Sequence, residues 1–242
     1  MTKNGNLLIH CPAQPGFNRI FELGEYNMKL TAFGLLVLKA GESCKSDIGE
    51  FEVALVLLGG KCRISGETFD FPEVGERKNV FDGKPHTVYL PRRTGYTVTA
   101  ITDVEIAVNA SPASRDTAPP TLVRPEDTRT FSLGRDNFTR QATVMIDEKF
   151  DSEHFYIGEG LIPSGNWSGY PPHRHDFDNP PEEIDMEETY FYRFDPPQGF
   201  GIQKVYTPDG RIDETYTVKN NDTVAIAEGF HPLCGAPGYQ MY

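Results

Sequence analysis

The sequence predicts an all-β fold made of many short strands. It contains 23 glycines and 19 prolines among 242 residues, a composition that suits tight turns between strands. Aromatic residues make up 12% of the chain, and they lie with β-branched residues in short alternating or apolar runs that are typical of strands. Sustained helical periodicity is absent, and Pro125 to Asp127 opens at most one turn of helix.

The predicted strands fall into two groups, which we expect to form two domains. The first group spans residues 26–38, 53–58, 87–90, 96–101 and 104–110, with 61–71 as a short hairpin across Gly66. The second group spans residues 155–162, 188–194, 200–206, 213–218 and 223–226. A stretch rich in Pro, Ser, Thr and Ala separates them. We therefore expect an N-terminal domain at 1–112, a connector at 113–125 and a C-terminal domain at 126–242.

Charge and composition exclude several classes of function. The net charge of −12 argues against nucleic-acid binding, which needs a basic face. No apolar run reaches the roughly 18 residues of a membrane span, and the N-terminus lacks the apolar core of a secretory signal. The four cysteines are scattered without metal-type spacing. We expect a cytoplasmic protein with free thiols that binds neither membrane nor nucleic acid.

Three histidines and one glutamate near the C-terminus predict a metal site. His173 and His175 are two residues apart, so in an extended strand both imidazoles project to one side. Glu188 opens the next predicted strand, and His231 follows a strand and a short bend. Three imidazoles and one carboxylate suit zinc, manganese, iron or nickel, and they suit calcium poorly.

This order of residues resembles the cupin pattern, in which His-x-His, a later Glu and a final His come from neighbouring hairpins. The strings GNWSGYPPHRHD, PPEE, MEETYFYRFDPPQGFGIQKVYT, DET and GFHP further resemble the 5-deoxy-glucuronate isomerases of myo-inositol catabolism, relatives of the 4-deoxy-5-keto-uronate isomerases. The similarity is dense from residue 166 to 242 and looser over 51–112. That family continues beyond the position of Tyr242, so we expect either a shortened C-terminal barrel or a variant.

The resemblance implies a fold, a reaction and a cofactor. The fold is two cupin barrels of the jelly-roll type; the first half repeats the strand outline without a His-x-His pair, so its barrel is expected to be structural. The reaction is an aldose–ketose isomerisation that converts 5-deoxy-glucuronate into 5-dehydro-2-deoxy-gluconate. One divalent transition metal per chain, zinc, manganese or iron, is expected at His173, His175, Glu188 and His231. A cupin Fe(II) dioxygenase and a non-catalytic sugar-binding cupin are the alternatives.

Two further residues are expected to border the metal and bind substrate. Tyr190 shares the strand face of Glu188, and Gln203 is an amide among apolar residues of the next strand, where it needs a polar partner. A bulge would reverse the parity of Tyr190. The general base is not identified, and association into a homo-oligomer is left open. The acidic insertion at 176–187 is expected to be a solvated loop, and Arg174 to face outward into a salt bridge.

Overall fold

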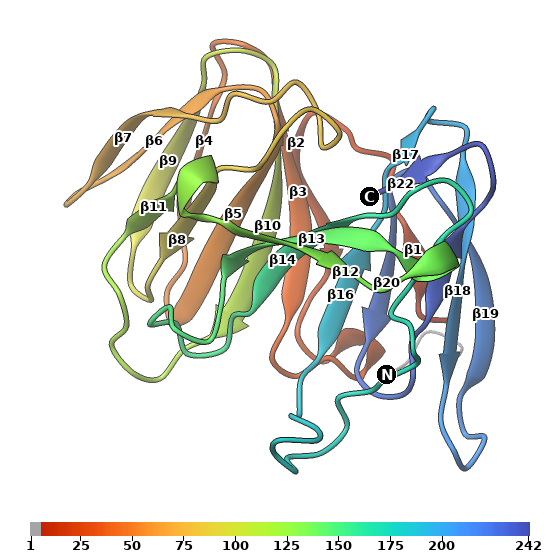
Figure 1. Ribbon diagram of the computed structural model, residues 1–242. Helices are drawn as coiled ribbons and strands as arrows, with labels where there is room; N and C mark the ends of the chain where they lie inside the picture. Colours follow the sequence, from red (N-terminus) through yellow and green to blue (C-terminus); the bar gives the residue numbers. More distant parts are fainter. Residues whose placement is uncertain (1–5) are drawn as a thin grey trace.

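The computed structural model describes residues 6–242 and consists almost entirely of β-strands (Figure 1). Helical segments in this range are single 3-10 turns: η1 (Glu25–Asn27), η2 (Pro125–Asp127) and η3 (Asp136–Phe138). No helix among the described residues is long and apolar enough to cross a membrane. The all-β prediction is confirmed, and η2 is the helical turn expected at Pro125.

The first lobe is a sandwich of two antiparallel sheets. The larger sheet has the order β11-β8-β5-β10-β3-β2 and the smaller one β4-β9-β6-β7. Apolar side chains from both sheets form one core between them. The strands are β2 (Gly16–Phe21), β3 (Ala32–Leu38), β4 (Ser43–Asp47), β5 (Phe51–Gly59), β6 (Cys62–Gly66), β7 (Asp70–Val74), β8 (Thr87–Leu90), β9 (Gly95–Ala100), β10 (Val104–Pro112) and β11 (Thr121–Val123).

The second lobe has smaller sheets, and apolar side chains of β17 to β22 form a separate core in it. Their orders are β15-β21-β18-β19, β1-β20-β16, β17-β22 and β12-β13-β14. The strands are β1 (Leu8–His10), β12 (Arg129–Leu133), β13 (Arg140–Ile146), β14 (Ile157–Leu161), β15 (Trp167–Ser168), β16 (Glu188–Phe191), β17 (Phe194–Asp195), β18 (Phe200–Tyr206), β19 (Asp213–Lys219), β20 (Asp222–Ile226), β21 (Leu233–Gly235) and β22 (Gln240–Met241).

A third core joins the lobes, and it explains why β5 is apolar along its whole length. Leu55 and Leu57 of β5 point into the first lobe, whereas Val56 and Leu58 point toward the second. Ala225 of β20 belongs to the same inter-lobe core. Because β5 is covered on both faces, its sequence is a continuous apolar run and lacks the alternation of a half-exposed strand.

Strand exchange and a buried ion pair also connect the lobes. β1 precedes the first lobe in sequence but pairs with β20, and β11, inside the expected connector, pairs with β8. Arg77 donates two hydrogen bonds of 3.0 Å to Glu159, and both side chains are at most 4% exposed. The division into domains at 1–112 and 126–242, with a connector at 113–125, stays a prediction. Residues 1–5 of the N-terminal domain lie outside the described range.

The predicted strands match the structure best where they are buried. β8 spans residues 87–90 and β18 spans 200–206, as expected. The strand predicted at 26–38 begins only at Ala32, because Tyr26 and Asn27 adopt positive φ angles of 53° and 64° in η1. β12 was missed because all its side chains are exposed and no apolar alternation marks it.

Candidate metal centre

Glu188 enters the second lobe from β16, the outer strand of its sheet. Its backbone pairs with Ile226 of β20. Phe191 points to the opposite face, where its ring lies 5.8 Å from that of Phe33 in the inter-lobe core. Glu188 and Tyr190 therefore share the face that looks into the second lobe, as the strand parity predicted.

His231 is placed by the bend that follows β20. Gly229 in this bend has a φ of 100°, and a Cβ there would lie 2.9 Å from the carbonyl oxygen of Tyr206, so a glycine is required. The Gly229 N–H donates a 2.7 Å hydrogen bond to the Asp176 carboxylate. Nδ1 of His231 lies 2.9 Å from the Gly229 carbonyl oxygen, and His231 is only 1% exposed.

His173 and His175 lie in a segment that belongs to no sheet, so the expectation of a strand is wrong at this point. Pro171 and Pro172, directly before His173, lack the backbone N–H groups that strand pairing uses. The chain that leads to this segment is held beside the start of β13, because the Asn166 amide donates a 2.8 Å hydrogen bond to the carbonyl of Thr139, the residue before β13. The two imidazoles nevertheless lie 5.2 Å apart between ring centroids.

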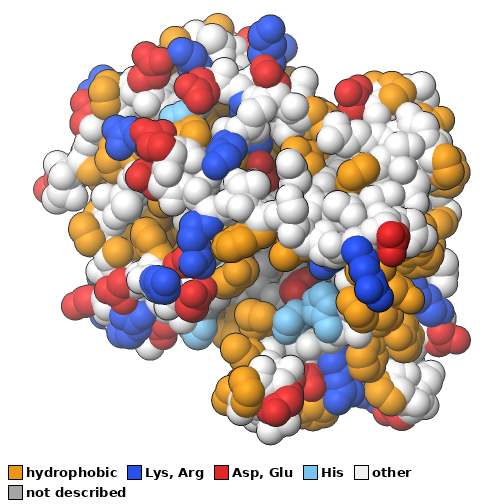
Figure 2. All heavy atoms as spheres, viewed as in Figure 1, with side chains coloured by type: hydrophobic (Ala, Val, Ile, Leu, Met, Phe, Trp, Pro, Cys, Tyr) orange, Lys and Arg blue, Asp and Glu red, His pale blue; other side chains and the backbone are white. Residues whose placement is uncertain are grey.

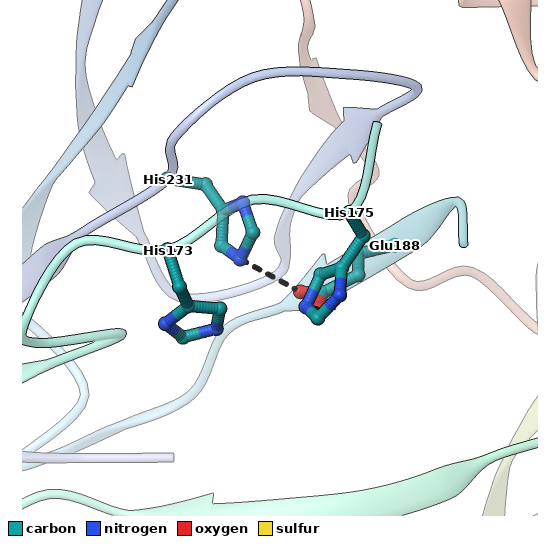
Figure 3. A group of neighbouring side chains, drawn as sticks. All are labelled: His173, His175, Glu188 and His231. Carbon is teal, nitrogen blue, oxygen red and sulfur yellow. Dashed lines mark ion pairs between the residues drawn. The ribbon is translucent and has the colours of Figure 1, made fainter. Parts of the chain in front are cut away.

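All four predicted ligands meet at one point. The donor atoms of His173, His175, Glu188 and His231 lie within 4.8 Å of one another, and Figure 3 shows the side chains turned together. Nε2 of His175 is 2.9 Å from one Glu188 oxygen, and Nε2 of His231 is 3.4 Å from the other. In Figure 2 histidine side chains lie inside a hollow of the surface.

The charges within the cluster are coupled. Burial raises the pKa of Glu188, but the hydrogen bond to His175 and the electrostatic influence of the neighbouring His231 and His175 outweigh it and hold the value at about 2. The hydrogen bond to Glu188 raises the pKa of His175. Burial lowers the pKa of His173, and the nearby His231 adds to that effect. The cluster therefore contains an ionised carboxylate and at least one imidazole that favours its neutral form.

Each imidazole is held from behind by the backbone. Nδ1 of His173 lies 3.3 Å from the carbonyl oxygen of Pro171, and that of His231 contacts Gly229. His175 has a backbone hydrogen bond with Ile184 in the insertion. Such contacts fix the ring orientation and leave the other nitrogen for a ligand. Sequence reasoning missed Pro171 and Ile184 because backbone atoms carry no residue-type signal.

Gln203 lies behind His231 and not at the cavity surface. It is 0% exposed, and its Nε2 donates a 2.7 Å hydrogen bond to the carbonyl oxygen of His231. Its Oε1 accepts a short hydrogen bond from the Tyr192 hydroxyl. Tyr190 stacks beside Tyr192, and its ring centroid lies 5.9 Å from that of His231. Of the two residues expected to bind substrate, Tyr190 thus lies beside the ring of His231, and Gln203 lies behind it, bonded to its backbone.

The acidic insertion is not merely a solvated loop, which corrects the expectation. Glu183 lies 3.3 Å from Nε of Arg174 and accepts a 2.8 Å hydrogen bond from the Asp176 N–H. Glu187 accepts hydrogen bonds of 2.5, 2.9 and 3.1 Å from three consecutive N–H groups, those of residues 29–31. Arg174 forms the expected salt bridge, but its partners are in the insertion. The insertion is thereby fixed to the first lobe and to the site.

The donor set fits a transition metal. Nε2 of His231 is buried and has no hydrogen-bond partner within the described residues, an arrangement that is costly unless another group satisfies the nitrogen. Three imidazole nitrogens and a carboxylate oxygen are ligands typical of zinc, manganese or iron. Among residues 6–242 this is the one cluster of at least three such side chains with metal-site spacing.

Comparisons with known proteins agree with the fold and the site. The KduI/IolB family matches residues 11–242. A 5-deoxy-glucuronate isomerase from Geobacillus kaustophilus is 39% identical over 211 residues, which cover 87% of this chain and 76% of the relative. The crystal structure of an IolB-like protein from Salmonella typhimurium LT2 superposes with a TM-score of 0.93 at 32% identity, over 98% of this chain and 90% of the other.

A more distant likeness defines the architecture. A variant of Bacillus subtilis oxalate decarboxylase superposes with a TM-score of 0.60 at 10% identity, over 97% of this chain and 74% of that protein. With the two jelly-roll lobes, this likeness identifies the fold as a bicupin. Within that class, the chain belongs to the KduI/IolB family.

Proposed function

We propose that the chain is a 5-deoxy-glucuronate isomerase, which converts that sugar acid into 5-dehydro-2-deoxy-gluconate in inositol degradation. The observation that carries the proposal is the His173, His175, Glu188 and His231 cluster in a chain of the KduI/IolB family. The isomerase name of the 39% identical relative from Geobacillus kaustophilus supports the choice of substrate.

A single divalent transition metal is proposed at the cluster, with zinc, manganese and iron as candidates. The four side chains would hold it, and the backbone carbonyls of Pro171 and Gly229 would orient two of the rings. When bound, such an ion supplies Lewis-acid stabilisation of negative charge on the carbonyl and hydroxyl oxygens of the open-chain sugar. The observations that support the site are the chemistry of the donors and the buried Nε2 of His231, which forms no hydrogen bond within the described residues.

The chain's own residues would position the substrate and manage the proton. The isomerisation moves one hydrogen between C1 and C2, and the sugar is neither oxidised nor reduced overall. Tyr190 is hydrogen-bonded to Glu188, and burial raises its pKa well above the usual range. A phenol that stays protonated can donate a hydrogen bond to an oxygen that gains negative charge. We assign this contact with substrate to Tyr190.

Gln203 is proposed to act through His231. It has no exposed surface, and both ends of its amide are hydrogen-bonded. These contacts favour an orienting role over a direct contact with substrate. We further propose a cytoplasmic location, which the four free cysteines support.

The test combines product analysis with metal analysis. Purified protein is incubated with 5-deoxy-glucuronate, the product is identified by NMR, and oxygen consumption is followed. Formation of 5-dehydro-2-deoxy-gluconate without oxygen uptake is expected; oxygen uptake would identify a dioxygenase, and binding without turnover a sugar-binding cupin. Elemental analysis of His175→Ala should show loss of most bound metal. His154→Ala is the control, because His154 lies outside the cluster.

A further inference from the structure

Arg140 lies at the start of β13, next to the segment that leads to His173. It is partly buried, and its Nη1 donates hydrogen bonds of 3.3 and 3.2 Å to the carbonyl oxygens of Phe138 and Tyr170. The ring of Tyr170 packs against Trp167, with centroids 5.8 Å apart. These contacts fix the guanidinium, and they leave part of its donor fork without a hydrogen-bond partner among residues 6–242.

This guanidinium differs from the other arginines that are not fully exposed. Each of those pairs with a carboxylate, and they are Arg77, Arg92, Arg174 and Arg193. Arg140 forms no ion pair with any of residues 6–242, although the protein has 35 acidic and 23 basic residues. In so acidic a chain, a partly buried arginine without an acidic neighbour is a preformed place for an external anion.

Arg140 lies beside the segment that carries two of the expected metal ligands, because the Tyr170 carbonyl that it contacts is three residues before His173. Burial raises the pKa of Tyr190, and nearby negative groups raise it further, whereas the positive charge of Arg140 acts in the opposite direction. The hydroxyl of Tyr190 bonds to Glu188, and its ring lies 5.9 Å from that of His231. Arg140 is therefore near Tyr190, which in turn contacts the cluster.

We propose that Arg140 binds the carboxylate of the sugar acid while its other end lies at the metal cluster. This inference rests on the proposed function, because the substrate considered is 5-deoxy-glucuronate. Its carboxylate is C6, four carbons beyond the reacting C1–C2 pair, so the group that recognises it has to lie away from the cluster. A guanidinium can hold a carboxylate by two parallel hydrogen bonds.

Arg174 is also close to the metal ligands, but its guanidinium already forms ion pairs within the protein. It lies 3.7 Å from Asp176 and 3.3 Å from Glu183, and its guanidinium packs over the rings of Phe177 and Phe230. A second anion at Arg174 would have to displace these acidic partners. Arg140 needs no such exchange.

The test measures whether the protein distinguishes a sugar acid from the matching neutral sugar. D-glucuronate and D-glucose differ in the C6 carboxylate, and their binding to the metal-loaded protein is followed by calorimetry and by the fluorescence of Trp167, the single tryptophan of the chain. Wild type should bind glucuronate more tightly. Arg140→Gln should weaken glucuronate binding by about 10- to 100-fold and leave glucose binding unchanged.

Two further variants separate charge from structure. Arg140→Lys keeps the charge and should retain part of the preference. Arg135→Gln changes an exposed arginine in the same β12–β13 turn and should behave as wild type. Melting temperature and metal content are recorded for each variant, and if Arg140→Gln is not folded, the comparison uses Arg140→Lys, which should then lose bidentate binding but not all preference.

The outcomes distinguish this inference from the proposed function. Equal binding of both sugars by wild type, or unchanged glucuronate binding by folded Arg140→Gln, overturns the role of Arg140. If wild type isomerises 5-deoxy-glucuronate and Arg140→Gln does so with an unchanged KM, the proposed function stands and the inference fails. If wild type does not isomerise it but the Arg140-dependent preference is measured, the carboxylate site stands and the proposed function fails.

Discussion

The side-chain amide of Gln203 donates a 2.7 Å hydrogen bond to the backbone carbonyl of His231. The same amide accepts a hydrogen bond from Tyr192, which directly follows β16, so a buried chain of contacts runs from Tyr192 through β18 to the last histidine of the cluster. Because Nε2 of His231 has no hydrogen-bond partner of its own, the orientation of this ring depends on what lies behind it.

Gln203→Leu is expected to weaken metal binding by about 10- to 100-fold, because His231 loses the contact that orients its backbone. Competition with a chelator measures the affinity, and circular dichroism measures the melting temperature. Gln141→Leu, at an exposed position of β13, is the matched control. An unchanged metal affinity in a folded Gln203→Leu protein would show that the amide serves packing alone.

Tyr190→Phe is expected to lower kcat by about 100-fold while metal content stays the same. The substitution keeps the ring beside His231 and removes only the hydroxyl that bonds to Glu188. Steady-state kinetics and the melting temperature are the measurements. Tyr206→Phe is the control, since its ring stacks on Phe230 outside the cluster. Full activity in Tyr190→Phe would assign the tyrosine to barrel packing.

Glu187→Gln should lower the free energy of unfolding by about 1–3 kcal/mol. Its carboxylate accepts three hydrogen bonds from the backbone N–H groups of residues 29–31, and charge-assisted bonds of this kind weaken when the acceptor becomes an amide. Urea denaturation measures the change. Glu182→Gln, at an exposed position of the same insertion, should have little effect; equal losses in both variants would contradict the anchoring role.

The stabilising contribution of the Glu153 carboxylate should be lost in acid. Hydrogen bonds from the Ser114 hydroxyl and from the N–H groups of Arg115 and Ser114 lower its pKa from 4.5 to about 2. Since the folded-state pKa is the lower one, the contribution is fully present above pH 4.5 and is lost as the pH falls toward 2. The stability difference between wild type and Glu153→Gln should therefore shrink across this window in denaturation curves.

The control for the acid effect is Glu67→Gln, at an exposed carboxylate of the β6–β7 turn that accepts no hydrogen bond from residues 6–242. Its difference from wild type should not follow the course seen for Glu153. A constant difference for Glu153→Gln between pH 6 and pH 2 would mean that the contacts with Ser114 and Arg115 do not favour the ionised carboxylate.

The sequence by itself determined many strands of the cores and the donors of the cluster, although the partly buried strands β2 and β13 were missed. The continuous apolar run of β5 and the alternating pattern of β18 reflect which side chains are buried, so both strands can be predicted from the sequence. The strand parity of Glu188 and Tyr190 likewise follows from local geometry, whereas His173 and His175 converge although their segment is not a strand.

The tertiary structure alone decided what surrounds those donors. Three features depend on segments that are distant in sequence or on backbone atoms. They are the hydrogen bond that His175 donates to the backbone of Ile184, the anchoring of Glu187 to residues 29–31, and the lack of an ion-pair partner for Arg140 among residues 6–242. A backbone contact has no residue-type signature, and the pairing of a charge depends on which groups the fold brings within a few ångströms. Neither property is encoded in a local pattern, because both belong to the packed chain.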